Sequence, residues 1–296
     1  MFALPGLVVC ALLTVYLVWG STYLAIQVAL TSFPPFMLMG TRFLLAGSVL
    51  FVFLKWRGKV TPSLAQWRDA GIVGSLILGG GMGLTSYAQQ YITSGLTAVF
   101  IACSPFILAF CVGMYGEWPN RREWFGILTG FSGAVLLASG QEFSARPIGI
   151  VALLGATICW NLGSVLSQRK FSLAPGAMGF ASQMLCGGVF LTAVSMLNGE
   201  HLAGPITQQA WLAWGYLVVA GSLAAFTAYM YLIATVTPAL ASSYSYVNPV
   251  IAVTLGVVLG GEKLGTREVV AMVIILSSVL LITTARQHLT TSKEQA

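Results

Sequence analysis

Charged residues are scarce in this chain: Asp, Glu, Lys and Arg make up only 7% of its 296 residues, where a soluble domain carries roughly 25%. Hydrophobic residues account for 57%, and the mean hydropathy is +0.86. This composition excludes a soluble globular domain and predicts an integral membrane protein. The net charge of +6 comes from Lys and Arg at the ends of apolar segments, so it indicates membrane topology and not nucleic acid as a partner.

The chain also has few of the side chains that catalysis and metal binding require. Its single aspartate, Asp69, lies at a predicted helix boundary, and its two histidines, His201 and His288, lie in a loop and in the tail. Chemistry in a membrane needs paired carboxylates, a nucleophile with a base, or metal ligands. A glycine-rich phosphate loop is absent from the sequence. We therefore expect no enzyme activity, no metal, no cofactor and no direct use of ATP, and a polytopic membrane enzyme is the disfavoured alternative.

Two features resemble special signals but are expected to be ordinary parts of membrane helices. The first apolar segment, from Leu4 to about Leu30, has no charged start and is too long for a signal peptide, so we expect a mature helix. The cysteines lie in apolar segments without paired spacing, which predicts small buried thiols and no disulfides. They are Cys10, Cys103, Cys111, Cys159 and Cys186.

Apolar windows long enough for a spanning helix of about 20 residues recur along the whole chain. There are ten, at residues 5–29, 35–54, 70–90, 95–115, 123–140, 148–168, 176–197, 211–233, 238–259 and 268–285. Short loops join them, and the uncharged joints Tyr91–Ser94 and Ala234–Thr237 are expected to be tight turns. The sequence therefore predicts an all-α integral membrane protein with ten transmembrane helices.

Lys and Arg are divided unevenly between alternate loops, which predicts the orientation. If the N-terminus is inside, the inner loops hold Lys55, Arg57, Lys59, Arg68, Arg121, Arg122, Arg169, Lys170, Arg286 and Lys293. The outer loops then hold only Arg146, Lys263 and Arg267. Because positive loops tend to remain in the cytoplasm, both termini are predicted to be cytoplasmic.

The second half of the chain repeats features of the first. Trp19 and Trp160 are 141 positions apart (160 minus 19), and Gly-Glu pairs ending at Glu117 and Glu262 are 145 apart (262 minus 117). Other matches are Gln27 with Gln168, Pro34 with Pro175, Arg42 with Gln183, Pro105 with Pro249, and Arg122-Glu123 with Arg267-Glu268. Five helices are an odd number, so the second copy must enter the membrane upside down. We predict two inverted five-helix repeats around a central cavity, at residues 1–141 and 142–286, with a cytoplasmic tail at 287–296.

These features together resemble a known family. The segment Trp19–Tyr23, Arg42, the prolines Pro105 and Pro249 and the Gly-Glu pairs, set in ten apolar windows, are similar to the drug/metabolite transporter superfamily, EamA type. The likeness covers residues from about 10 to 285, and is greatest to bacterial inner-membrane exporters of amino acids and related metabolites. It implies a basket of ten helices with a central cavity, alternating access, and small organic solutes as cargo, in the bacterial inner membrane.

Arg42 is the only formal charge well inside a predicted helix. A cation at this depth costs roughly 2.5–3.5 kcal/mol on insertion scales, so some interaction must offset it. It serves either as a counter-charge for a carboxylate or phosphate of the cargo, or as a structural arginine that reaches the outer surface or neighbouring carbonyls. Its repeat partner Gln183 is neutral, which excludes a symmetric charged clamp.

Aromatic and amide side chains within the predicted helices are the other candidates for the cavity wall. With Arg42, the predicted cavity residues are Trp19, Tyr23, Tyr87, Gln90, Trp160, Ser164, Gln183, Tyr229, Tyr231, Tyr244, Tyr246 and Asn248. For any one of them, a hydrogen bond between helices is the alternative role.

Pro105 and Pro249 are predicted to interrupt their helices and to free the carbonyls of Ile101 and Ser245. The interruption is either a hinge or gate, or a static kink. Glu117 and Glu262 end the same two helices. They either titrate during transport or pair with Arg121 and Lys263.

The predicted function is export of small organic metabolites, with amino acids favoured because Arg42 suits a carboxylate and the tyrosines suit an apolar or aromatic body. Efflux of lipophilic cations is the alternative. No predicted helix interior contains Asp, Glu or His, which favours a facilitator over proton antiport through Glu117 or Glu262. One chain holds both repeats and can form its own cavity, so a monomer is expected.

Overall fold

The computed structural model describes residues 5–92, 97, 101, 104–138, 146–260 and 265–285, and these are almost entirely helical. The first half contains α1 (Gly6–Ala29), α2 (Pro35–Trp56), α3 (Leu64–Gly74), η1 (Ser75–Gly83), α4 (Leu84–Ala88), α6 (Ser104–Gly113) and α7 (Arg121–Ala138). The second half contains α8 (Pro147–Arg169), α9 (Ala177–Leu197), α10 (Gln208–Tyr216), η2 (Leu217–Phe226), α11 (Thr227–Thr235), α12 (Pro238–Ala241), α13 (Tyr244–Gly260) and α14 (Thr266–Ala285). The predicted all-helical class is confirmed.

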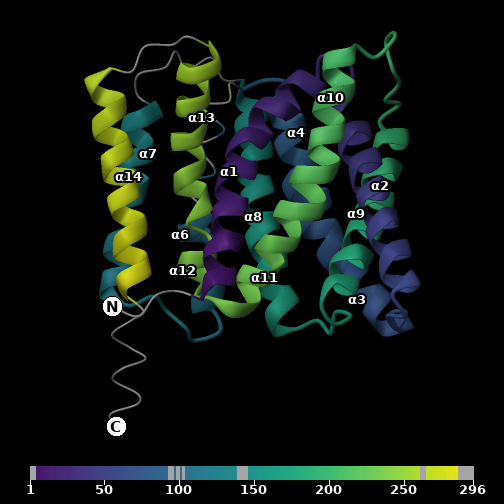
Figure 1. Cartoon of the computed structure of the whole chain (residues 1–296), viewed down its shortest axis with the longest axis horizontal. Helices are drawn as coiled ribbons and strands as arrows, with labels where there is room; N and C mark the ends of the chain where they lie inside the picture. The colour runs from purple at the N-terminus through teal and green to yellow at the C-terminus, as the bar shows by residue number, and fades with distance from the viewer. Residues whose placement is uncertain are drawn as a thin grey trace.

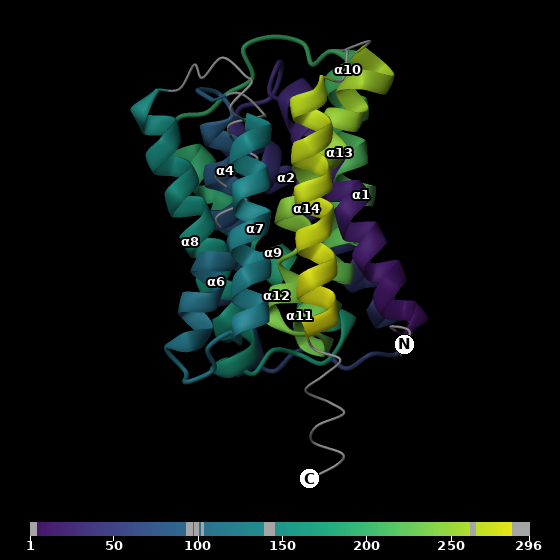
Figure 2. The ribbon, with the colours of Figure 1, turned by 90° about the vertical axis from the view of Figure 1, so that its left-hand side faces the viewer.

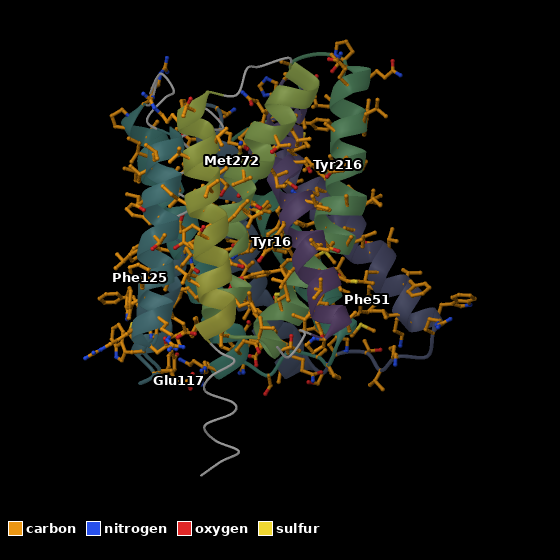
Figure 3. All side chains as sticks on the ribbon, turned by 60° about the vertical axis from the view of Figure 1, so that its left-hand side comes forward. Tyr16, Phe51, Glu117, Phe125, Tyr216 and Met272 are labelled. Carbon is orange, nitrogen blue, oxygen red and sulfur yellow. The ribbon has the colours of Figure 1, made fainter. Side chains whose placement is uncertain are left out.

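Six helices among the described residues are long and apolar enough to cross a membrane, judged by length and composition. They are Gly6–Ala29, Pro35–Trp56, Leu64–Ala88, Pro147–Arg169, Ala177–Leu197 and Gln208–Thr235. Two of the six contain a π-helical stretch in the middle, η1 and η2, with α-helix on both sides. The outer surface of the bundle is apolar, as in Phe125, which is 62% exposed, whereas Glu117 lies at one end (Figure 3).

The helices run side by side and alternate in direction (Figures 1 and 2). α1 begins and α14 ends at the same end of the bundle, which we call the terminal side. The helices α2 and α9 pack against each other at one edge, and α7 and α14 pack against each other at the other edge. Each of these pairs joins corresponding helices from the two halves of the chain.

Glycines allow the close crossing of α2 and α9. A Cβ on Gly47 would lie 2.9 Å from the backbone nitrogen of Leu185, and a Cβ on Gly188 would lie 2.8 Å from that of Leu44. The two contacts are the same contact made twice, because Gly188 and Leu185 follow Gly47 and Leu44 by 141 positions (188 minus 47 and 185 minus 44). Small residues at such crossings let backbones approach and pack.

Glycines also allow the close crossing of α7 and α14, and here the repeat spacing is 145 positions. A Cβ on Gly130 would lie 2.7 Å from Ser278 Oγ, and a Cβ on Gly133 would lie 2.8 Å from Ile275. Ile275 and Ser278 follow Gly130 and Gly133 by 145 positions (275 minus 130 and 278 minus 133), so this is again the same contact made twice. The spacings of 141 and 145 residues read from the sequence therefore relate equivalent positions of helices that cross each other in space.

The predicted helix over 238–259 is wrong as one continuous element. α12 ends at Ala241 and α13 begins at Tyr244, so the break lies at Ser242 and Ser243, and helix continues through position 249. Ser243 Oγ donates to the Leu240 carbonyl at 2.7 Å, and Ser245 Oγ donates to the Ser242 carbonyl. Serine hydroxyls that bond the nearby backbone compete with the helical ladder, which explains why the break precedes the proline.

Other local predictions have mixed outcomes. The expected turn at Ala234–Thr237 is confirmed, because only Val236 and Thr237 separate α11 from α12. The four described cysteines are free thiols as expected, but Cys10 is exposed and Cys111, Cys159 and Cys186 are only partly buried. Their burial was therefore predicted wrongly, because apolar positions on a membrane helix also face outward. Cys103, Glu262 and Lys263, and the side chain of Pro249, lie outside the described residues.

We expect the glycine crossings to limit stability. Gly47→Ala or Gly188→Ala places a methyl group against backbone that cannot move aside, at a cost of about 1–3 kcal/mol from overpacking. Each variant should lower the thermal unfolding midpoint of the detergent-purified protein. Gly71→Ala is the matched control, because nothing lies within 4 Å of its added methyl group. Equal midpoints for Gly47→Ala and Gly71→Ala would contradict the close crossing.

Candidate functional site

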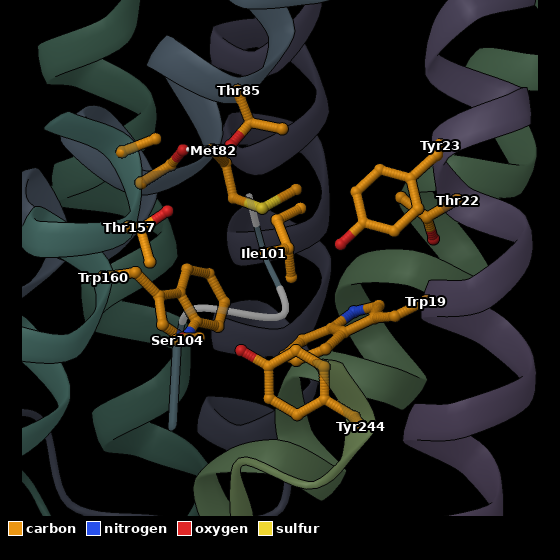
Figure 4. Close-up of a pocket in the computed structure, with 12 residues that line it drawn as sticks. Trp19, Thr22, Tyr23, Met82, Thr85, Ile101, Ser104, Thr157, Trp160 and Tyr244 are labelled. Carbon is orange, nitrogen blue, oxygen red and sulfur yellow. Dashed lines mark hydrogen bonds between the residues drawn. The ribbon is translucent and has the colours of Figure 1, made fainter. Parts of the chain in front are cut away.

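A cavity lies between helices of both halves of the chain, near the middle of the bundle (Figure 4). Its unfilled space, counted out to its open end, is about 500 Å³. Its described wall consists of Trp19, Thr22, Tyr23, Gly81, Met82, Thr85, Ile101, Ser104, Ala156, Thr157, Trp160 and Tyr244. We call it the central cavity.

Four aromatic rings from α1, α8, α11 and α13 pack into one layer at the terminal-side end of the central cavity. Trp19 lies 5.3 Å from Trp160, 5.1 Å from Tyr229 and 4.9 Å from Tyr244, measured between ring centroids. Tyr229 also lies 5.2 Å from Trp160 and 5.6 Å from Tyr244. α1 runs away from the terminal side, so Trp19 lies nearer that side than Tyr23 does (Figures 1 and 4). We call these four residues the aromatic layer.

Hydrogen bonds fix the orientation of the rings in the aromatic layer. The hydroxyl of Tyr229, a residue only 1% exposed, accepts from Trp160 Nε1 at 3.1 Å and is bonded to Ser164 Oγ at 2.9 Å. Trp19 Nε1 donates to the carbonyl of Gly221 in η2 at 3.4 Å. Buried indole N–H and phenol O–H groups need such partners, so these bonds hold the rings of Trp19, Trp160 and Tyr229 in one arrangement.

The polar part of the cavity wall consists of hydroxyl groups. Thr22, Thr85 and Thr157 each donate to the backbone carbonyl four residues earlier, at 2.7 to 2.8 Å. Each hydroxyl oxygen keeps lone pairs that can accept from a bound solute. Ser104 Oγ accepts from Asn161 Nδ2 at 2.7 Å. No charged side chain is present in the part of the wall that the structure describes.

The structure brings together four of the predicted cavity residues, Trp19, Tyr23, Trp160 and Tyr244, in one wall. Tyr229 and Ser164 lie behind that wall, in and beside the aromatic layer. Sequence reasoning missed the hydroxyl residues and Met82. A signal for two of them existed, because Thr22 and Thr157 lie three positions from Trp19 and Trp160 and therefore share a helix face with them.

The remaining predicted cavity residues lie elsewhere. Tyr87 and Gln90 line a shallow hollow at the end of the bundle opposite the terminal side, and Gln183 and Tyr231 line a separate cavity on the terminal side. Tyr246 donates from its hydroxyl to the Ile127 carbonyl at 3.0 Å and joins α13 to α7. These residues were predicted to be one wall because periodicity cannot tell which helix a side chain faces.

Asn248 is fully buried beside Tyr23. The Tyr23 hydroxyl lies within hydrogen-bonding reach of its amide, and neither amide atom has a partner of good hydrogen-bond geometry among the described residues. Pro105 is buried near the start of α6, and residues 102 and 103 before it lie outside the described part of the chain. Whether it interrupts a helix therefore remains a prediction.

Arg42 does not line the central cavity. Its side chain is buried between α2 and η2, where Nε donates to Ser222 Oγ at 2.7 Å and Nη1 contacts Met39 Sδ at 3.6 Å. Its guanidinium lies 4.8 Å from the centroid of the Phe43 ring. No carboxylate among the described residues pairs with it. In this structure Arg42 contacts the π-helical stretch η2, which also holds the acceptor of the Trp19 indole.

Glu117 has a different partner from the predicted one. Its carboxylate accepts from both terminal nitrogens of Arg169, at the end of α8, rather than from Arg121. This hydrogen bonding lowers the pKa of the Glu117 carboxyl below its ordinary value. Both side chains are partly exposed, so the pair is screened by solvent and contributes little to stability.

Comparison with known proteins identifies similar chains over the whole length described above. The model of the EamA-like transporter family matches residues 6–139 and again residues 147–284. A protein of Escherichia coli (strain K12) named "Uncharacterized inner membrane transporter YedA" is 42% identical over 274 residues, which cover 92% of this chain and 89% of that protein.

More distant relatives and one solved structure are similar as well. "Protein PecM" of Dickeya dadantii (strain 3937) is 26% identical over 270 residues, covering 90% of this chain and 88% of that protein. A solved crystal structure matches with a TM-score of 0.78 at 21% identity, covering 95% of this chain and 98% of that chain. At this identity the likeness shows the fold alone.

We expect the Tyr229 hydroxyl to hold the aromatic layer together. Tyr229→Phe keeps the ring but leaves the buried Trp160 N–H without its acceptor, which should cost about 1–3 kcal/mol. The thermal unfolding midpoint should fall. Tyr115→Phe, at a 49% exposed tyrosine, serves as control and should change the midpoint little. An unchanged midpoint in Tyr229→Phe would show that the hydroxyl does not anchor the layer.

Proposed function

Because the chain belongs to the EamA-like transporter family, we propose that it exports small organic metabolites, with amino acids or related compounds favoured, by alternating access between two inverted repeats. The observation that carries this proposal is the central cavity, whose wall comes from both halves of the chain and ends at the aromatic layer. A site between repeats is where transporters of this kind bind their cargo.

The proposed architecture has ten spans in repeats at residues 1–141 and 142–286, followed by a cytoplasmic tail at 287–296. The exchanged contacts of α2 with α9 and of α7 with α14 support the repeats, as do the alternating helix directions. The name of the Escherichia coli relative supports an inner membrane location. The excess of Lys and Arg in the terminal-side loops supports cytoplasmic termini. We propose that the transporter acts as a monomer.

The proposed cargo follows from the chemistry of the wall. Threonine and serine oxygens can accept from an ammonium or amide group, and the rings of Trp19, Trp160 and Tyr244 can pack against an apolar or aromatic body. An amino acid meets these two features with its ammonium group and an apolar side chain, while its carboxylate finds no cationic partner in the described wall. A lipophilic cation, the alternative cargo, would pack against the same rings, and like the ammonium group of an amino acid it would find no carboxylate in the described wall.

The proposed transport step is opening of the aromatic layer. The four rings lie at the terminal-side end of the central cavity, and we propose that cargo passes to that side when they move apart. No acid or histidine lies in the described wall, which supports a facilitator that runs down the cargo gradient. Proton antiport through Glu117 is the weaker possibility, because this side chain pairs with Arg169 at the end of the bundle.

The central cavity can be tested by filling it. We expect amino acids to raise the thermal unfolding midpoint of the purified protein, since a ligand that binds the folded state stabilises it. Met82→Trp places a larger side chain in the cavity and should abolish both this shift and counterflow in proteoliposomes. Met114→Trp, at an 80% exposed position, should leave both unchanged.

Two outcomes would contradict the proposal. If only lipophilic cations raised the thermal unfolding midpoint, the function would be multidrug efflux and not amino acid export. Uphill accumulation driven by an imposed pH gradient would replace the facilitator by an antiporter.

Arg42 should not determine which cargo is bound. Since its guanidinium contacts Ser222 and Met39 and does not reach the cavity wall, Arg42→Gln should change the ratio of affinities for an amino acid and its amide analogue by less than about twofold. The ratio is measured by stabilisation across a concentration series, with Arg57→Gln as the exposed control. If Arg42→Gln selectively lost affinity for ligands that bear a carboxylate, Arg42 would have to contact the cargo.

A further inference from the structure

A second and larger cavity lies on the terminal side, separate from the central cavity. It is bounded by the start of α1, the end of α8, residues 171–176, the start of α9, and η2 with α11. Its unfilled space, counted out to its open mouth, is about 1750 Å³. Ala228 and Met230 line it, and Tyr229 between them belongs to the aromatic layer. We call it the terminal-side cavity.

Two residues that line the terminal-side cavity each carry a buried oxygen that has no hydrogen-bond partner among the described residues. The two oxygens are Gln183 Oε1 and Thr227 Oγ1. Gln183 is 0% exposed, and its Nε2 donates to the Gly179 carbonyl at 3.2 Å. A carbonyl accepts only from the nitrogen end of the amide, so this bond fixes the orientation of the amide and leaves Oε1 as an acceptor without a partner.

Thr227 lacks the side-chain hydrogen bond that other threonines in these helices make to their own backbone. Thr14, Thr157 and Thr235 each donate to the carbonyl four residues earlier. Thr227 directly follows the π-helical stretch η2, and its hydroxyl makes no such bond. An unsatisfied buried hydroxyl or amide oxygen costs free energy, so a ligand that brings a donor is favoured at this place.

The rest of the wall defines the body of that ligand. The described lining has no charged side chain, and its large members include Phe171, Phe180, Leu223 and Tyr231. A carboxylate would find no cationic partner there and a cation no anionic partner, so burying either charge is costly. Lys170, exposed beside the cavity at the end of α8, further disfavours a cation.

We infer that the terminal-side cavity is a binding site for uncharged amphipathic molecules that carry a hydroxyl or amide N–H donor on an apolar body. Gln183 Oε1 accepts the donor, Thr227 Oγ1 lies in the same wall as a second polar contact, and the aromatic and aliphatic side chains pack against the body. The site differs in chemistry from the zwitterion site proposed for the central cavity. It rests on the cavity and its two oxygens, and does not require that amino acids be the cargo.

The test uses the purified full chain in lipid nanodiscs and two photoreactive probes. One is octanol carrying a diazirine, and the other is the corresponding octane without the hydroxyl. We expect the alcohol to label residues 167–183 or 223–234 saturably, and excess unlabelled octanol to displace it. It should label about fivefold more efficiently than the hydroxyl-free probe, as expected for one neutral hydrogen bond.

Variants test whether Gln183 accepts the hydrogen bond from the hydroxyl group of the probe. Gln183→Leu should reduce labelling by the alcohol to that by the hydroxyl-free probe. Gln89→Leu is the matched control, because Gln89 is also a buried glutamine with an unpartnered Oε1 but does not line this cavity. If Gln183→Leu does not fold, Thr227→Val and the comparison of both probes on the unmodified chain decide the question.

The proposal is overturned if the two probes label the unmodified chain equally, if labelling does not saturate, or if Gln183→Leu and Gln89→Leu behave alike. Neither probe is an amino acid. A negative result here therefore leaves the cargo proposal standing, and failure of amino acids to bind the central cavity leaves this site standing.

Discussion

The structure depends on one constraint: in hydrocarbon, every backbone polar group must find its partner within the protein. Long helices meet that constraint for the backbone. Side-chain hydroxyls within the helices also find partners there, because Thr22, Thr85 and Thr157 donate to carbonyls of the preceding turn. Buried polar side chains that lack a hydrogen-bond partner are therefore informative. Among the described residues, Gln183 and Thr227 keep unpartnered oxygens in a cavity wall, where a solute rather than the chain can complete the bonding.

The two halves of the chain meet through exchanged contacts, and these converge on the aromatic layer. Trp160 of α8 packs on Gly81 in η1, where an added Cβ would lie 2.9 Å from its ring, and Trp19 of α1 bonds to Gly221 in η2. Each tryptophan thus contacts the π-helical stretch of the other half. π-helical turns are rare and often occur at functional sites. Movement of η1 or η2 would be transmitted to the rings because the indoles contact them directly.

The sequence predicted the class of fold and the repeat spacing because hydropathy and spacing are properties of a single chain. It also predicted Trp19, Tyr23, Trp160 and Tyr244 in one wall. It could not predict that Arg42 contacts Ser222, since the period of a helix does not say which neighbour a side chain meets. The hydroxyl lining was missed for a similar reason, because threonines that bond their own helix look the same in sequence whether or not they face a cavity.

If it is to act as the proposed gate, the aromatic layer must be stable enough to close the path and weak enough to open. A ring pair contributes about 0.5–1.5 kcal/mol beyond its burial, and a buried neutral hydrogen bond about 0.5–1.5 kcal/mol net. The five ring pairs of the layer share the same four side chains, so their energies are not independent. A barrier of a few kcal/mol is within what a cargo can offset, provided that it binds the open arrangement more tightly than the closed one. The layer can therefore act as a gate without a charge or an added energy source at the site.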